Sequence, residues 1–84
     1  MTDQLKLVDA FKMNLKFIMF EMNLSPEQLG EKLGGISRQS VYKMLNTDDI
    51  KTSTIGKVAA ALGYEETDLT DPNFKTRYIN KDIK

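Results

Sequence analysis

The apolar residues of this chain recur at helical spacing, and the first segment shows the pattern on two faces. Between about residues 5 and 22, one set of apolar positions steps by four, three and four residues, which is typical of the buried face of a helix. This set consists of Phe11, Leu15, Ile18 and Met22, extended by Leu7 and Val8. A second set with the same steps lies on the opposite side and consists of Met13, Phe17, Phe20 and Leu24. The sequence therefore predicts a first helix that is apolar on two faces.

Helix caps and glycines mark the next element. Ser25 is a favourable N-cap, Pro26 suits the first helical position, and Gln28 completes a Ser-x-x-Gln capping box. Gly34 or Gly35 can take the left-handed conformation that ends a helix. The sequence therefore predicts a short second helix between Ser25 and this glycine pair.

Two further helices follow from the same kind of evidence. Ser37 is the expected N-cap of a third helix. The buried stripe of that helix is expected to consist of Val41, Met44 and Leu45. A fourth helix is expected from about Thr52 or Ser53 to Leu62, and Gly63 would stop it.

The last part of the chain gives weaker signals. A short fifth helix is expected over about residues 65–69, because acidic residues favour a helix N-terminus. After Pro72 the side chains alternate, which favours a strand or an extended arm. One side of this alternation carries Phe74, Thr76 and Tyr78, and the other carries Lys75, Arg77 and Ile79.

The second and third predicted helices have the features of a helix-turn-helix, in which two short helices are joined by a tight turn that contains glycine. Gly30 and Leu33 would lie where the two helices cross. The outer face of the third helix carries Arg38, Gln39 and Lys43. Arginine and lysine can pair with the acceptors of guanine, and glutamine can pair with adenine. These residue types at the start of such a helix indicate contact with DNA bases.

Three segments carry a resemblance to a known family. They are residues 24–34 (LSPEQLGEKLG), 36–44 (ISRQSVYKM) and 57–63 (KVAAALG). Over roughly residues 11 to 70, the chain resembles the Xre/Cro-type, lambda repressor-like helix-turn-helix regulators. The resemblance implies an all-α fold of five helices in a domain of residues 1–70. Residues 71–84 would then form a C-terminal tail.

The resemblance also implies which residues contact double-stranded DNA. Base contacts near the start of the third helix carry over to Arg38, Gln39 and Lys43, with Ser40 and Tyr42 as further candidates. Phosphate contacts are implied at the starts of the second and third helices, at the end of the third helix and in the loop after it. These candidates are Ser25, Gln28, Ser37, Asn46, Lys51 and Thr52.

The sequence departs from the family pattern at four places. Pro26 stands where relatives often have a glutamine that reaches a phosphate, and Gly30 stands where they usually have alanine. The turn contains an extra glycine in the Gly34-Gly35 pair. The loop after the third helix contains Asp48 and Asp49, which would repel a phosphate. We therefore expect modest DNA affinity or a need for a dimer.

Composition narrows the function further. The chain has 84 residues with 12 basic and 12 acidic side chains, and it has no Cys and no His. Neutrality weakens non-specific attraction to phosphate. Without His and Cys the commonest metal ligand, general base and nucleophilic thiol are missing, so we expect no enzyme, no metal and no cofactor. The chain is too short for a separate ligand domain, so no small-molecule ligand is expected. It also has no apolar stretch of the ~20 residues that span a membrane and no signal peptide, so we expect a cytoplasmic protein without a membrane partner.

The second apolar face of the first helix needs a cover, because exposed apolar patches mark interfaces. The cover is expected to come from the tail, either within one subunit or across a homodimer. The residues of this expected cluster are Met13, Phe17, Phe20, Phe74, Tyr78 and Ile79. A homodimer on DNA is also expected because two reading heads about 34 Å apart would recognise a palindromic site.

Two functions therefore follow from the sequence. The first is a sequence-specific regulator of transcription, a repressor of bacterial or phage origin that reads the major groove with its third helix. The alternative is a protein-interaction module or antitoxin of the same fold, whose main partner is another protein. Neutral charge, the acidic loop and the second apolar face favour that alternative more than is usual for the family.

Overall fold

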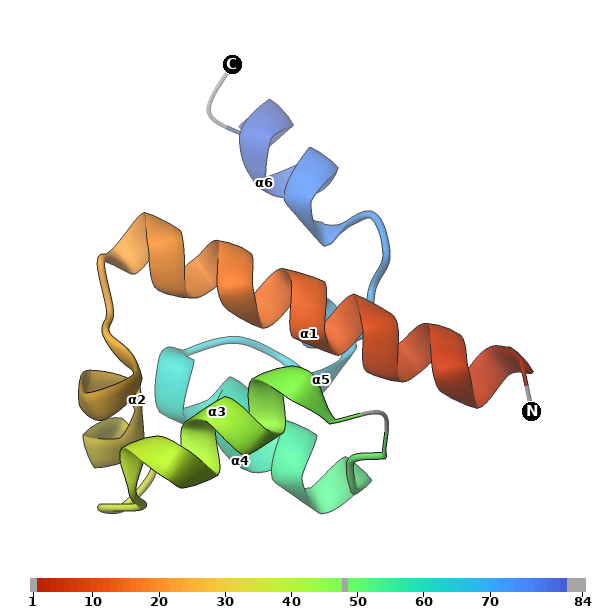
Figure 1. The fold of residues 1–84 in the computed structure, drawn as a ribbon. Helices are drawn as coiled ribbons and strands as arrows, with labels where there is room; N and C mark the ends of the chain where they lie inside the picture. The colour runs from red at the N-terminus through yellow and green to blue at the C-terminus, as the bar shows by residue number, and fades with distance from the viewer. Residues whose placement is uncertain (1, 48, 82–84) are drawn as a thin grey trace.

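The computed structural model describes residues 2–47 and 49–81, and within this part every regular element is a helix. The helices are α1 (Thr2–Met22), α2 (Pro26–Lys32), α3 (Arg38–Asn46), α4 (Thr52–Leu62), α5 (Glu66–Leu69) and α6 (Phe74–Lys81). In Figure 1 the long helix α1 lies between α6 on one side and the helices α2, α3 and α4 on the other. The all-α prediction is therefore confirmed, with one helix more than expected.

The core forms where α1 meets the later helices. Phe11, Leu15 and Ile18 are buried on α1, as their spacing predicts. They pack with residues from every later helix, including Leu29, Val41, Val58, Leu69 and Phe74. Two details of the prediction are wrong: α1 begins at Thr2 rather than near residue 5, and Met22 is 43% exposed. Met22 lies in the last position of α1.

The predicted caps of α2 and α3 are confirmed. The Oγ atom of Ser25 accepts a hydrogen bond from the backbone N–H of Gln28 at 3.1 Å, and the backbone N–H of Ser25 donates to Oε1 of Gln28 at 2.8 Å. The Oγ atom of Ser37 accepts from the backbone N–H of Ser40 at 3.1 Å. These bonds satisfy N–H groups that have no partner within their own helix.

A buried asparagine joins α1 to the region around α5, and the hydrophobic pattern gave no sign of it. Asn14 is fully buried. Its side-chain amide nitrogen, Nδ2, donates to the backbone carbonyl oxygens of Leu69 at 2.9 Å and Asp71 at 2.8 Å, and more weakly to that of Asp68 at 3.3 Å. These carbonyls lie at the end of α5, where a short helix leaves its last acceptors without internal partners. Asn14 therefore fixes the point at which the chain turns towards α6.

The prediction of a strand or extended arm after Pro72 is wrong, because Phe74–Lys81 is the helix α6. Phe74 and Tyr78 are four residues apart, so a helix places both rings on the same face. The guanidinium of Arg77 also contacts the carboxylates of Asp71 at 2.7 Å and Asp68 at 3.2 Å. The alternating pattern could not reveal this helix because its partners lie elsewhere in the chain.

Candidate nucleic-acid interface

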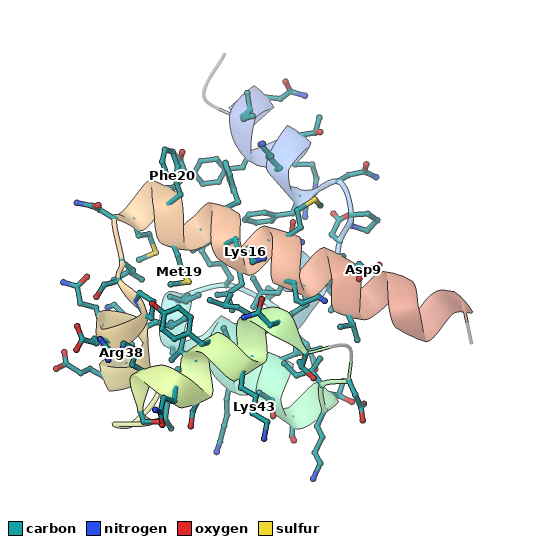
Figure 2. The ribbon with its side chains drawn as sticks, viewed as in Figure 1. Asp9, Lys16, Met19, Phe20, Arg38 and Lys43 are labelled. Carbon is teal, nitrogen blue, oxygen red and sulfur yellow. The ribbon has the colours of Figure 1, made fainter. Side chains whose placement is uncertain are left out.

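The outer face of α3 exposes all five side chains for which base contacts were predicted. Arg38 begins this helix and Lys43 lies in its last turn. Both are exposed, as are Gln39, Ser40 and Tyr42. Figure 2 shows Lys43 on the side of α3 that faces away from α1. Burial of the opposite face holds the helix against the core, so the exposed face has a fixed direction.

The inner face of α3 is the reason for that fixed direction. Val41, Met44 and Leu45 are buried there. They belong to the same core as Phe11 and Leu15 of α1. A side chain on the outer face is therefore positioned by packing as well as by the local helix geometry.

The turn between α2 and α3 approaches α2 very closely, and this explains two of the departures from the family pattern. Gly34 and Gly35 both have positive φ angles, of 98° and 90°, which favour glycine. The carbonyl oxygen of Gly30 accepts hydrogen bonds from the backbone N–H groups of Gly35 at 3.0 Å and Ile36 at 3.1 Å. A Cβ atom added to Gly30 would collide with the carbonyl oxygen of Ile36. The two glycines of the turn therefore allow the backbone to fold back onto α2, and the glycine at position 30 leaves room for it.

An acidic residue that sequence reasoning missed lies beside the predicted base-contacting arginine. The carboxylate of Glu27, in the first turn of α2, lies 4.0 Å from the guanidinium of Arg38. Both side chains are largely exposed. An exposed pair of this kind adds about 1 kcal/mol or less to folding. Any anion or hydrogen-bond acceptor that binds Arg38 must compete with the carboxylate of Glu27. The sequence signal for this pair is the opposite charge at the starts of two neighbouring helices, since Glu27 is the second residue of α2 and Arg38 is the first residue of α3.

A hollow of about 450 Å³ lies between α3 and the start of α4. Its polar lining includes Ser40, Lys43, Thr47, Lys51 and Thr54. Two ammonium groups and three hydroxyl groups are suited to hold a phosphate oxygen. Asp49 also lines the hollow, and it opposes binding of an anion there.

The predicted phosphate-contacting residues occupy different settings. Ser25, Gln28 and Ser37 form the helix caps described above, so their side chains already have partners within the protein. The side-chain amide of Asn46 donates to the carbonyl oxygen of Tyr42 at 2.8 Å. Lys51 and Thr52 are exposed at the start of α4. Of the two loop aspartates, Asp49 is exposed and Asp48 lies outside the described residues.

Only half of the residues of the predicted tail cluster pack together, and the other half are exposed. Phe17 packs edge-on against Phe74 and Tyr78, with ring centroids 6.3 Å and 5.2 Å apart. Phe20, by contrast, is 80% exposed, and Ile79 and Met13 are also exposed. Helix α6 therefore covers Phe17 on the second apolar face within the same chain, and leaves Met13 and Phe20 exposed.

Two classes of site are not found among the described residues. No group of three or more acidic, Cys or His residues within residues 2–47 and 49–81 is placed to hold a metal ion. In the same part of the chain, no helix is both long enough and apolar enough to cross a membrane.

Comparison with protein families places this arrangement in context. The model of a family described as Helix-turn-helix matches residues 15–69, which extend from the middle of α1 to the end of α5. The chain therefore belongs to this helix-turn-helix family, of the Xre/lambda repressor-like type. It is a family of DNA-binding proteins and not of enzymes. Comparisons with curated proteins and with solved structures give no match.

Proposed function

We propose that the protein binds specific sequences of double-stranded DNA by placing α3 in the major groove. The observation that carries this proposal is the two-sided character of α3. Its inner face is buried in the core, and its outer face exposes Arg38, Gln39 and Lys43 in a chain of a DNA-binding family. Ser40 and Tyr42 are further candidates for base contact. The DNA-binding unit in this proposal is residues 1–70, and residues 71–84 are its tail.

The chemistry of these side chains suits base recognition. The planar guanidinium of Arg38 can donate two hydrogen bonds to O6 and N7 of guanine, and the amide of Gln39 can donate to and accept from adenine. Lys43 stands near the hollow beside α4, so it can reach either a base or the neighbouring phosphate. Phosphate contacts at Ser25, Gln28, Ser37, Asn46, Lys51 and Thr52 would set the position of α3 along the groove.

The biological part of the proposal is a transcriptional repressor that acts as a homodimer. One α3 helix reads only a few base pairs, so a dimer that reads a palindrome gains specificity. A small protein of this kind would block a promoter by occupying it. Its place of action in this proposal is the cytoplasm of a bacterial cell, which holds both the chromosome and any phage DNA.

Binding to a selected duplex tests this function. We expect Arg38→Ala and Lys43→Ala to lose about 1–3 kcal/mol of binding free energy, with preference relaxed at particular base pairs. Lys75→Ala is the matched control, because it removes one positive charge from α6, away from α3. Fluorescence anisotropy at fixed salt measures all four proteins. The proposal is wrong if both α3 variants bind the selected duplex as the unchanged protein does.

A second function is favoured by one observation. Phe20 on α1 is 80% exposed, and aromatic residues are enriched in protein–protein interfaces. In this alternative the chain is an interaction module or antitoxin whose main partner is another protein. It predicts weak, salt-sensitive DNA binding without sequence preference. Anisotropy repeated at rising salt, with the selected duplex and with a scrambled one, would reveal this.

A further inference from the structure

One face of α1 carries an alternation of charged and apolar side chains that no described part of the chain covers. This outer seam consists of Asp9, Met13, Lys16 and Phe20, at steps of four, three and four residues. At about 100° per residue, these four positions lie within about 60° of one another. They lie opposite the buried face of α1. All four side chains are exposed, with Met13 at 46% and Phe20 at 80%. Figure 2 shows Asp9, Lys16 and Phe20 following one another along α1.

The tail helix does not cover the seam. Helix α6 packs on α1 through Phe17, which is about 60° around the helix from Phe20. Lys75 of α6 also lies over the ring of Phe17, at 5.6 Å from its centroid. The contacts of α6 therefore end at the flank of the seam.

The charges of the seam on one copy can pair with those of the seam on a second copy. Asp9 and Lys16 are seven residues apart, with Met13 between them. Two copies of α1 that pack antiparallel, with the two-fold axis between positions 12 and 13, place Asp9 of each copy opposite Lys16 of the other. The two Met13 side chains then meet beside the axis. A parallel arrangement in the same register would instead place Asp9 opposite Asp9 and Lys16 opposite Lys16.

Asp9 and Lys16 are both exposed, so each can form an ion pair with a second copy of the chain. Asp9 lies 4.0 Å from Lys12 on the same helix, but its own side chain is 75% exposed. Lys16 is exposed. An alternation of four and three residues is also the spacing at which two helices can pack along a continuous line. The seam involves no residue of α3, so pairing through it leaves the reading face untouched.

We propose that the outer seam of α1 is the surface through which two copies of this chain associate, with their α1 helices antiparallel. This inference deepens the dimer part of the proposed function by naming its interface. The seam has four residues per copy, far fewer than the roughly 20–30 residues on each side of a standard interface. The association is therefore weak in solution, with a Kd above about 1 μM. Two copies bound to one palindrome would be held together more strongly, because the DNA raises their effective concentration.

A charge-swap experiment without DNA tests the antiparallel register. Asp9→Lys and Lys16→Asp each replace two attractive pairs with two repulsive ones, so each variant alone should associate about tenfold more weakly. A mixture of the two variants restores both pairs and should associate as the unchanged protein does. Sedimentation equilibrium at high micromolar concentrations measures all four samples. Glu31→Lys, on α2, is the control for a change of charge outside the seam.

A disulfide experiment gives an independent test. The chain has no cysteine, so Met13→Cys introduces a single thiol next to the proposed axis. Under mild oxidation this variant should form a covalent dimer much faster than Ser53→Cys, whose thiol lies on α4. Equal rates for the two thiols would overturn the proposal. So would an unchanged protein that stays monomeric throughout, or a mixture of charge variants that fails to associate. Because no DNA is present, these results are separate from any failure of DNA binding.

Discussion

Replacing Gly30 by alanine tests how the helix-turn-helix is built. Glycine is a poor helix former, so alanine in the middle of α2 would ordinarily stabilise the helix by up to about 1 kcal/mol. Here the new Cβ would collide with the carbonyl oxygen of Ile36. That oxygen belongs to the backbone of the turn, so no side-chain rotation can relieve the contact. The turn must move as a whole.

The magnitudes decide the sign of the effect. Overpacking of a well-packed site costs about 1–3 kcal/mol. Movement of the turn would also strain the hydrogen bonds from Gly35 and Ile36 to the carbonyl oxygen of Gly30, which are 3.0 Å and 3.1 Å long. Overpacking less the gain in helix propensity leaves a loss of about 0–2 kcal/mol, and weakening of these hydrogen bonds adds up to about 1 kcal/mol. We therefore expect Gly30→Ala to lower the free energy of unfolding by about 1–2 kcal/mol.

A second glycine provides the matched control. Gly56 lies within α4, and a Cβ added there would meet only the carboxylate of Glu66, at 3.8 Å, an ordinary contact distance. Gly56→Ala should therefore raise the free energy of unfolding by about 0.5–1 kcal/mol. Urea unfolding followed by circular dichroism at 222 nm measures both variants. With a slope of about 1 kcal/mol per molar urea, the midpoint should fall by about 1–2 M for Gly30→Ala and rise for Gly56→Ala.

The result that would refute this reasoning is a Gly30→Ala variant as stable as the unchanged protein, or more stable. The close approach of the turn to α2 would then be absent in solution. Loss of stability with an altered slope would point instead to a change in the unfolded state. A Gly30→Ala protein that is folded at low temperature should also bind the selected duplex more weakly, because the shifted turn changes the direction of α3.

Three further predictions follow from single contacts. Asn14→Asp should lower the free energy of unfolding by more than about 2 kcal/mol, because a buried carboxylate cannot donate to the carbonyl oxygens that Asn14 binds, and thermal unfolding measures this loss. The backbone N–H of Asn73, together with the guanidinium of Arg77, holds the pKa of Asp71 below its usual value. Stability from this group is therefore present above the unfolded pKa of about 4 and is lost as pH falls through the lower folded pKa, so Asp71→Asn should flatten the decline in stability below about pH 4. Glu27→Gln should tighten binding to the selected duplex severalfold by freeing Arg38, and the gain should shrink in an Arg38→Ala background if the 4.0 Å ion pair is the cause.

Local rules were enough to predict most helix boundaries. The caps at Ser25 and Ser37 depend on contacts within four residues, so the sequence alone contains the necessary information. The stripe of Phe11, Leu15 and Ile18 was also visible, because a long amphipathic helix buries the residues that its period aligns. The family resemblance added the pairing of α2 with α3 as a reading head.

The remaining features depend on partners distant in the chain. The sequence does not show that Asn14 is buried, because the carbonyl oxygens that it binds come from the end of α5, about 55 residues later in the chain. Helix α6 depends on contacts with Phe17 across the molecule and on the ion pairs of Arg77, so alternation along the tail predicted the wrong element. Position 30 requires glycine because the backbone carbonyl of Ile36 in the following turn lies too close for a Cβ atom. The sequence does not predict the path of that backbone.

The candidate DNA-binding site shows the same limit. The exposure of Arg38 and Lys43 could be expected once the buried face of α3 was known. The ion pair of Arg38 with Glu27 could not, because it depends on the angle between two helices. The hollow beside α4 likewise brings Ser40 and Lys51 together from separate elements.

The central claim is that α3 reads a DNA sequence, and selection of bound duplexes from a random library at low salt tests it most directly. The intact chain should enrich one sequence, arranged as a palindrome if two copies bind together. The same selection with Lys43→Ala should lose preference at particular positions of that sequence. Recovery of an unenriched library, with weak binding that disappears as salt rises, would contradict the claim and direct attention to a protein partner at Phe20.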